Sequence, residues 1–226
     1  MSKITRLQNR KLSVVISLAF LLLLTAVGFR YFAGWVSDNL LETTEFIVEG
    51  SNLFIFGEIN TKTLTQFEEV ITEHPDIETL VFTIVPGSND DDTNFEVGRL
   101  VRQMGLGTHL VGNGIIESGG VDLFLSGVTR TMETGGQMGV HAWSDETYEA
   151  TDYPEDSPEH DLTLDYMIDM GFPAEFYWFT IYQASADDMY FMDKNDLAQF
   201  GLLTMPIIYD TKMKTPFDEE MSTYSE

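Results

Sequence analysis

The feature that most restricts the fold is an almost continuous apolar run, Leu80–Val85, which lacks helical spacing. Runs of this kind are typical of strands buried on both faces, as in a parallel sheet covered by helices. A segment with the helical spacing of buried residues ends before it at Pro75, and a second one follows the loop Asn89–Asn94. This alternation of strand and helix predicts an α/β fold with a largely parallel sheet.

Shorter patterned segments extend the alternation to residue 209. An acidic, proline-containing stretch, Asp145–Asp161, interrupts them and is interpreted as an exposed loop or flap. The helix expected over residues 173–184 is rich in aromatic side chains, which is more typical of a core or a subunit contact than of a ligand site. Further strands are expected over residues 46–48, 53–56, 108–111, 189–192 and 202–209, and further helices over 162–170 and 193–200.

Ser118 is the first candidate for chemistry, because it stands directly before Gly119-Gly120 and an apolar run. This pattern favours a helix N-terminus, where free backbone N–H groups and the helix dipole hold an anion. An oxyanion needs the same surroundings, and a histidine within reach, such as His141 after a glycine-rich strand, would take the serine proton. The alternative is that Ser118 is an ordinary helix N-cap.

The composition excludes several classes of site and partner. The chain has no cysteine, which excludes disulfides, thiolate metal sites and a cysteine nucleophile. From Asp38, the first acidic residue, to the end, 37 acidic residues face 7 basic ones, and such a charge repels nucleic acid. The other three histidines, His74, His109 and His160, show no ligand spacing, and Asp90–Asp92 do not match an EF-hand loop. The sequence therefore predicts no metal, no cofactor and no nucleic-acid partner.

The N-terminal residues predict a membrane anchor. The run Leu12–Phe29 holds 18 residues without a charge, which meets the threshold for a membrane-spanning helix. Four basic residues precede it and only Arg30 follows closely, so the positive-inside rule leaves the N-terminus in the cytoplasm and puts the rest outside. The rival interpretation is a signal peptide cleaved near Ala26–Gly28. Both interpretations export the acidic part of the chain.

These observations divide the chain into five parts. They are a basic cytoplasmic tail (1–11), a transmembrane signal anchor (12–33), a linker (34–45), a folded domain (46–211) and a flexible acidic tail (212–226). We therefore expect a single-pass protein of the cytoplasmic (inner) membrane, with its folded domain on the periplasmic side.

Several segments of the folded domain occur in an order known from one superfamily. The most specific is Ser118–Gly127 (SGGVDLFLSG), with Arg130 and then Gly139-Val140-His141 after it. Before it a buried strand ends at Pro86-Gly87, and after it Asp188 precedes the element Phe200-Gly201-Leu202. Over residues 46–209 the chain resembles the Clp-protease/crotonase superfamily, and most of all its periplasmic Clp-protease-like members. The resemblance implies a spiral of repeated ββα units.

The resemblance also implies roles for individual residues. Ser118 would be the nucleophile and His141 the general base, with the N–H groups of Gly87 and Gly119 forming the oxyanion hole. The acid of the triad would be Asp188, with Asp187 as the alternative. A peptide or protein would be the substrate. Homo-oligomers are common in the superfamily, and the sequence leaves the oligomeric state open.

Four positions depart from the family pattern and leave a second interpretation open. Ser88 stands where the family has the second glycine of Pro-Gly-Gly, and Ile116 and Gly120 stand where periplasmic relatives usually have cysteines. Glu117 directly precedes the serine, and a carboxylate there disfavours alkoxide charge unless it points away. The alternative is a catalytically degenerate binding or scaffold module, tethered to the membrane, that meets a partner through the helix at 173–184.

Overall fold

A computed structural model describes residues 44–145, 147–209 and 215–216. The predicted cytoplasmic tail (1–11), the signal anchor (12–33), residues 34–43 of the linker and most of the acidic tail lie outside the described residues. Within the described part, every helix is too short or too polar to cross a membrane.

The centre of the described domain is a mostly parallel sheet, as the sequence predicts. The strands lie in the order β1-β2-β3-β4-β6-β7, and β5 pairs with β4 as well. The β2–β3, β3–β4, β4–β5 and β4–β6 pairs are parallel, whereas β1 and β7 are antiparallel to their neighbours at the two edges. The strands are β1 Glu45–Glu49, β2 Asn52–Phe56, β3 Thr79–Val85, β4 Gly107–Glu117, β5 Arg130–Met132, β6 Gln137–Val140 and β7 Tyr190–Phe191.

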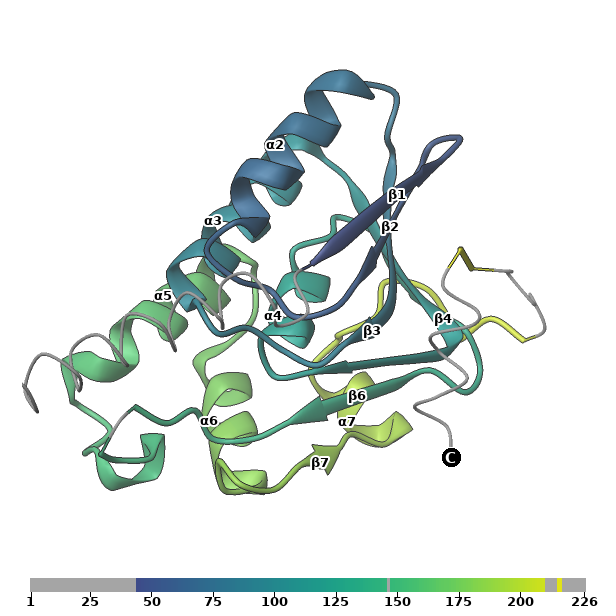
Figure 1. Cartoon of the computed structure of the whole chain (residues 1–226). Helices are drawn as coiled ribbons and strands as arrows, with labels where there is room; N and C mark the ends of the chain where they lie inside the picture. Colours follow the sequence, from purple (N-terminus) through teal and green to yellow (C-terminus); the bar gives the residue numbers. More distant parts are fainter. Residues whose placement is uncertain (1–43, 146, 210–214, 217–226) are drawn as a thin grey trace, which may run out of the picture. The chain divides into compact units, whose positions relative to one another are not determined.

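The helices connect these strands and cover the sheet. In Figure 1, α2, α3 and α5 follow one another along one side of the sheet, while α6 lies beside β6 and β7. Phe95 of α3 stacks on Tyr166 of α5 with ring centroids 4.3 Å apart, and this contact joins the two helices. The helices are α2 Thr63–Glu73, α3 Asp91–Met104, α4 Gly119–Leu125, α5 Asp161–Asp169, α6 Ala174–Gln183 and α7 Lys194–Gln199, with 3₁₀ turns at Ala150–Asp152 and Pro158–His160.

Strand β3 is buried on both faces, as its apolar run predicts. No residue from Leu80 to Val85 is exposed. Leu80 and Phe82 belong to the main core shared with the helices, whereas Val81 and Ile84 belong to a smaller cluster on the other face with residues of β2 and β4. The backbone N–H and C=O groups of β3 form hydrogen bonds with β2 and β4, so the strand tolerates complete burial.

Strand β4 is longer than the sequence predicts. It was expected over residues 108–111, but it continues to Glu117 and leads directly into Ser118. Its pairing with β3 shifts register. Phe82 of β3 pairs with Leu110 of β4, but the next pair joins Ile84 of β3 to Ile115 of β4. The residues skipped on β4 form a bulge around Gly112–Gly114, and glycines in a strand often mark such bulges rather than a turn. One half of β4 thus pairs with β5 and the other half with β6.

The final strand expected over residues 202–209 does not form as a regular element. Two separate contacts replace it: Thr204 donates its N–H to the Arg130 carbonyl, and Ile208 donates to the Met132 carbonyl, at 3.0 and 2.9 Å. Pro206 lies between them and has no N–H to donate, so a continuous ladder is broken there.

Candidate active site

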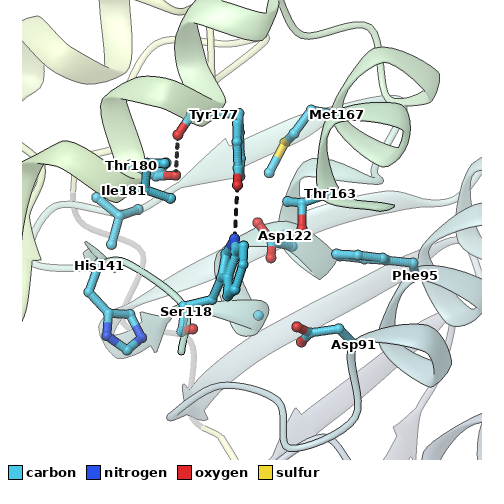
Figure 2. A pocket seen from close by; sticks show the side chains of 13 residues that line it. Asp91, Phe95, Ser118, Asp122, His141, Thr163, Met167, Tyr177, Thr180 and Ile181 are labelled. Carbon is cyan, nitrogen blue, oxygen red and sulfur yellow. Dashed lines mark hydrogen bonds between the residues drawn. The ribbon is translucent and has the colours of Figure 1, made fainter. Parts of the chain in front are cut away.

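A cavity of about 40 Å³ lies at the carboxyl ends of β4 and β6. Ser118, Gly119 and His141 line it together with Asp91 and Asp122. Figure 2 shows Ser118 and His141 on one side and Asp91 and Asp122 on the other. This is the edge at which ligands bind in parallel α/β sheets. The structure therefore brings two of the predicted catalytic residues, Ser118 and His141, into one pocket.

Ser118 has a backbone conformation that few non-glycine residues adopt. Its φ and ψ are 48° and −125°, and it is the one non-glycine residue with positive φ in the described part of the chain. Ser118 stands at the N-cap position of α4, as the alternative interpretation has it, but its side chain makes no capping hydrogen bond. Such a conformation costs about 1–3 kcal/mol and persists only where the surroundings impose it. A strained serine between a strand and a helix is the arrangement of a nucleophile elbow.

Glycines allow the chain to pack closely around this turn. Gly87 has a φ of 136°, and a Cβ atom there would lie 3.3 Å from the Ser118 Cβ atom. A Cβ atom at Gly120 would lie only 2.7 Å from the Val85 carbonyl oxygen, so the start of α4 presses on the end of β3. This contact explains why a larger residue is absent at position 120.

Two backbone N–H groups near Ser118 have no acceptor in the described part of the chain, and Gly119, which carries one of them, lines the pocket. The N–H groups of Ser118 and Val121 are occupied, because they donate to the carbonyls of Gly139 and Ser118 at 2.9 and 2.8 Å. Within residues 44–145, 147–209 and 215–216, neither Gly87 nor Gly119 donates its N–H to any acceptor. Donors of this kind can stabilise an oxyanion.

His141 follows β6 and is half-buried at the pocket. Its Nδ1 atom lies 3.1 Å from the carbonyl oxygen of Ala186. Because a carbonyl only accepts hydrogen bonds, Nδ1 carries the hydrogen and Nε2 keeps a lone pair in the neutral ring. Neither Nε2 nor the Ser118 hydroxyl has a hydrogen-bond partner among the described residues, so the two groups share the pocket without a hydrogen bond between them.

The predicted triad acids lie outside this contact. Asp187 and Asp188 are both exposed in the turn before β7, and the Asp188 carboxylate accepts a hydrogen bond of 2.8 Å from the N–H of Met189. The group that orients His141 in this structure is the carbonyl of Ala186, which lies two residues before Asp188 in the sequence. A catalytic part for Asp188 stays a prediction.

No protein-family model and no curated protein matches the sequence. Among solved structures, a mutant of ClpP1 from Listeria monocytogenes aligns with a TM-score of 0.52 and 14% identity, over 71% of this chain and 92% of that one. The 1510-N membrane-bound stomatin-specific protease aligns with a TM-score of 0.48 and 15% identity, over 72% of this chain and 78% of that one. A probable enoyl-CoA hydratase/isomerase from Mycobacterium abscessus aligns with a TM-score of 0.44 and 11% identity, over 71% of this chain and 67% of that one. The chain has the fold of the Clp-protease/crotonase superfamily.

This identification confirms the resemblance inferred from the order of sequence segments. The Clp/crotonase fold serves several chemistries, and the residues of the pocket determine which reaction a member carries out. No group of three or more His, Asp or Glu side chains suited to a metal ion occurs in the described part of this Clp/crotonase-like domain.

Glu117, the carboxylate next to the serine, does not line the pocket. Burial raises the pKa of Glu117, and the charge of His141 opposes that rise. The carboxylate is therefore close enough to His141 to stabilise a positive imidazolium.

Asp122 and Asp91 are pocket residues that the sequence reasoning missed. Asp122 is partly exposed at the pocket, and desolvation raises its pKa well above the ordinary value, with Asp91 adding to the rise. Asp91 is exposed at the mouth of the pocket, and partial desolvation raises its pKa while a hydrogen bond from Ser88 lowers it. The spacing of Ser118 and Asp122 places them on one helical face, a signal that was present in the sequence.

An aromatic network joins the acidic stretch 145–161 to the pocket. The indole N–H of Trp143 donates to the Tyr177 hydroxyl at 2.8 Å, and that hydroxyl lies 2.5 Å from Nδ1 of His160. His160 is 0% exposed, so this end of the predicted flap is part of the core, although most of the stretch is exposed as expected. Burial raises the pKa of Tyr177 to about 12, which keeps its hydroxyl protonated.

The strain at Ser118 predicts different stabilities for two substitutions that both remove the hydroxyl. Ser118→Ala keeps a Cβ atom at positive φ, whereas Ser118→Gly relieves the strain. We expect the glycine variant to be about 1 kcal/mol more stable than the alanine variant in urea unfolding, after the greater entropy of unfolded glycine is included. A glycine variant that is clearly the less stable of the two would contradict the strained turn.

The burial of Asp122 predicts a pH-dependent cost. The pKa of Asp122 is raised in the folded state. The protonated carboxyl therefore contributes its full share to the free energy of unfolding below the unfolded pKa of about 4, and this share is lost as the pH rises through the folded pKa. Asp122→Asn removes this ionisation. The unfolding free energy of the variant relative to wild type should therefore increase from about pH 4 to about pH 8. Parallel stability curves over this range would contradict the buried carboxyl.

Proposed function

We propose that the domain is a serine hydrolase, and specifically a peptidase, with Ser118 as nucleophile and His141 as general base. The observation that carries the proposal is the strained backbone of Ser118 at a strand–helix turn that shares a pocket with His141. Strain of this kind is concentrated at functional sites, since a purely structural serine has no need of it.

The first step would form a bond between the Ser118 oxygen and the substrate carbonyl carbon, while Nε2 of His141 takes the hydroxyl proton. The Nδ1 hydrogen bond to the Ala186 carbonyl supports this step, because it keeps the lone pair on Nε2. Glu117 would stabilise the imidazolium that forms. In this proposal a main-chain carbonyl orients the ring, as the aspartate does in a triad.

The N–H groups of Gly87 and Gly119 would receive the negative charge of the carbonyl oxygen. Each such donor is typically worth about 10²–10³ in rate. His141 would then return its proton to the leaving amine, which departs with the peptide bond broken. Water would attack the acyl-serine in the same way, releasing the acid product and restoring the Ser118 hydroxyl.

The departures from the family pattern do not remove any part of this machinery. Gly120 is required by the contact with Val85, and the Ser88 hydroxyl accepts the Asp90 N–H at 3.1 Å while supporting Asp91. The charge of His141 lowers the pKa of Glu117, against the rise that burial causes. These contacts favour the hydrolase over the degenerate binding module. The choice of a peptide bond is supported by the likeness to ClpP1.

A fluorophosphonate probe tests the proposal on the purified full-length chain in detergent. Wild type should be labelled at Ser118, and Ser118→Ala should lose the label. His141→Gln should slow labelling by about 10² or more, the scale of general base catalysis. Ser144→Ala, at an exposed serine outside the pocket, is the control and should label normally. Undiminished labelling of Ser118→Ala would rule out this nucleophile.

Asp188→Asn separates the two ways of orienting His141 in the same assay. With the Ala186 carbonyl as the orienting group, the variant should keep most of its labelling rate. A triad aspartate would instead cost about 10⁴. A loss of that size would restore Asp188 to the site.

We also propose that residues 12–33 anchor the domain in the cytoplasmic membrane with the domain outside, on the evidence of the uncharged run and the basic residues before it. The full chain should remain in the membrane fraction after a high-salt, alkaline wash. Protease added to intact spheroplasts should digest the domain. A variant without residues 1–34 is the control and should lose both properties. A soluble mature chain that begins after Gly28 would instead establish the cleaved signal peptide.

A further inference from the structure

The acidic stretch Asp145–Asp161 contacts the piece of main chain that orients His141. Ala186, whose carbonyl oxygen lies 3.1 Å from Nδ1 of His141, donates its own N–H to the Glu149 carboxylate at 3.2 Å. The two backbone groups of one residue therefore bond to the histidine and to an acidic side chain. Glu149 is thus two hydrogen bonds away from the proposed general base.

The backbone around Glu149 is fixed to the residues that follow His141. Ala150 is buried and donates its N–H to the carbonyl of Trp143 at 2.8 Å. Ser144 and Glu149 also form an antiparallel bridge. Because His141 and Glu149 are held by the same short segment after β6, the distance between them changes little unless this pairing breaks.

Ala186 lies in the turn between α6 and β7, outside both elements. The Asp188 N–H closes this turn by donating to the Ser185 carbonyl at 3.1 Å, and Ala142 holds its beginning by donating to the Ala184 carbonyl at 2.9 Å. Since Ala186 belongs to neither a helix nor a strand, contacts from outside the turn decide where its carbonyl points. The bond from its N–H to a carboxylate is of the stronger, charge-assisted kind.

Glu149 also caps the 3₁₀ turn Ala150–Asp152, and this second contact shows why its length matters. Its side chain accepts a backbone N–H of that turn, and Asp152 in return accepts the Glu149 N–H at 3.0 Å. Short side chains such as aspartate and serine are the preferred N-caps, and glutamate is not among them. A cap alone therefore does not explain glutamate here, whereas the contact with Ala186 uses its longer side chain.

We propose that Glu149 is a positioning residue for His141. It holds Ala186 so that the Ala186 carbonyl keeps the hydrogen on Nδ1 and the lone pair on Nε2, which faces the reaction. The carboxylate acts on the ring through a main-chain group, in place of the direct contact expected of Asp188. The acidic stretch is then part of the support of the active site. The effect on rate rests on the proposed hydrolase, whereas the effect on the ring stands on the hydrogen bonds.

Two substitutions at position 149 test the role of side-chain length by fluorophosphonate labelling of the full-length chain in detergent. Glu149→Gln keeps the length and an oxygen acceptor, so it should keep most of the labelling rate of Ser118. Glu149→Asp keeps the charge and a favourable N-cap but is one methylene shorter. It should slow labelling by about 10- to 100-fold, the scale of a small misplacement of a catalytic group.

The matched control is Asp152→Ala, which breaks the other half of the same cap, has no contact with Ala186 and should label at the wild-type rate. If Glu149 acted only as a cap or as a charge, Glu149→Asp would label faster than Glu149→Gln, and this order would overturn the proposal. Equal slowing by Glu149→Asp and Asp152→Ala would trace the effect to the 3₁₀ turn and would overturn it as well.

The tautomer of His141 separates this inference from the hydrolase proposal. In NMR spectra of the full-length chain with isotopically labelled histidine at alkaline pH, Nδ1 of His141 should be the protonated nitrogen, and His141→Gln identifies its signals. Glu149→Asp should give signals of mixed tautomers, whereas Glu149→Gln should not. Labelling of Ser118 with rates and tautomers that ignore both variants would overturn the positioning role and leave the hydrolase standing. A tautomer that depends on Glu149, without any labelling, would support the positioning role and overturn the hydrolase.

Discussion

The hydrogen bond from the Ser118 N–H to the Gly139 carbonyl, 2.9 Å long, is the contact on which the site depends. It continues the β4–β6 ladder one residue beyond the last regular pair, Glu117 with Gly139. The chain must then turn at once into α4, which leaves Ser118 in its unfavourable conformation. The same ladder directs β6 toward His141. One set of backbone bonds therefore positions both the nucleophile and the base.

The strain in this turn is small beside the burial that maintains it. Ser118 costs about 1–3 kcal/mol, whereas each fully buried apolar side chain contributes about 1.5–3 kcal/mol. Val121, Leu123, Phe124 and Leu125 of α4 are all 0–1% exposed. The packing of α4 against β3 and α3 therefore stabilises the fold by more than the strained turn costs. Asp122 lies on the same helix and lines the pocket, so the burial of α4 also fixes the position of this carboxyl.

Much of the fold followed from local pattern. The apolar run of β3 predicted a strand covered on both faces, and Asp193 predicted the start of α7, where its side chain accepts the N–H groups of Asn195 and Asp196. Both depend on periodicity or on neighbours within four residues. The extension of β4 was missed because Gly112–Gly114 has the composition of a turn. Its bulge is stable only because β3, β5 and β6 all pair with the same strand.

The sequence by itself determined the alternation of strands and helices and the identity of Ser118 and His141 as candidates, because these rest on spacing along the chain. The tertiary structure alone decided what each candidate contacts. The partner of His141 Nδ1 is a carbonyl 45 residues away, and every residue has a carbonyl, so no residue type marks it. Asp91 and Asp122 line one pocket because α3 packs beside α4. Side-chain partners depend on which distant segments meet, and burial across the whole domain decides that.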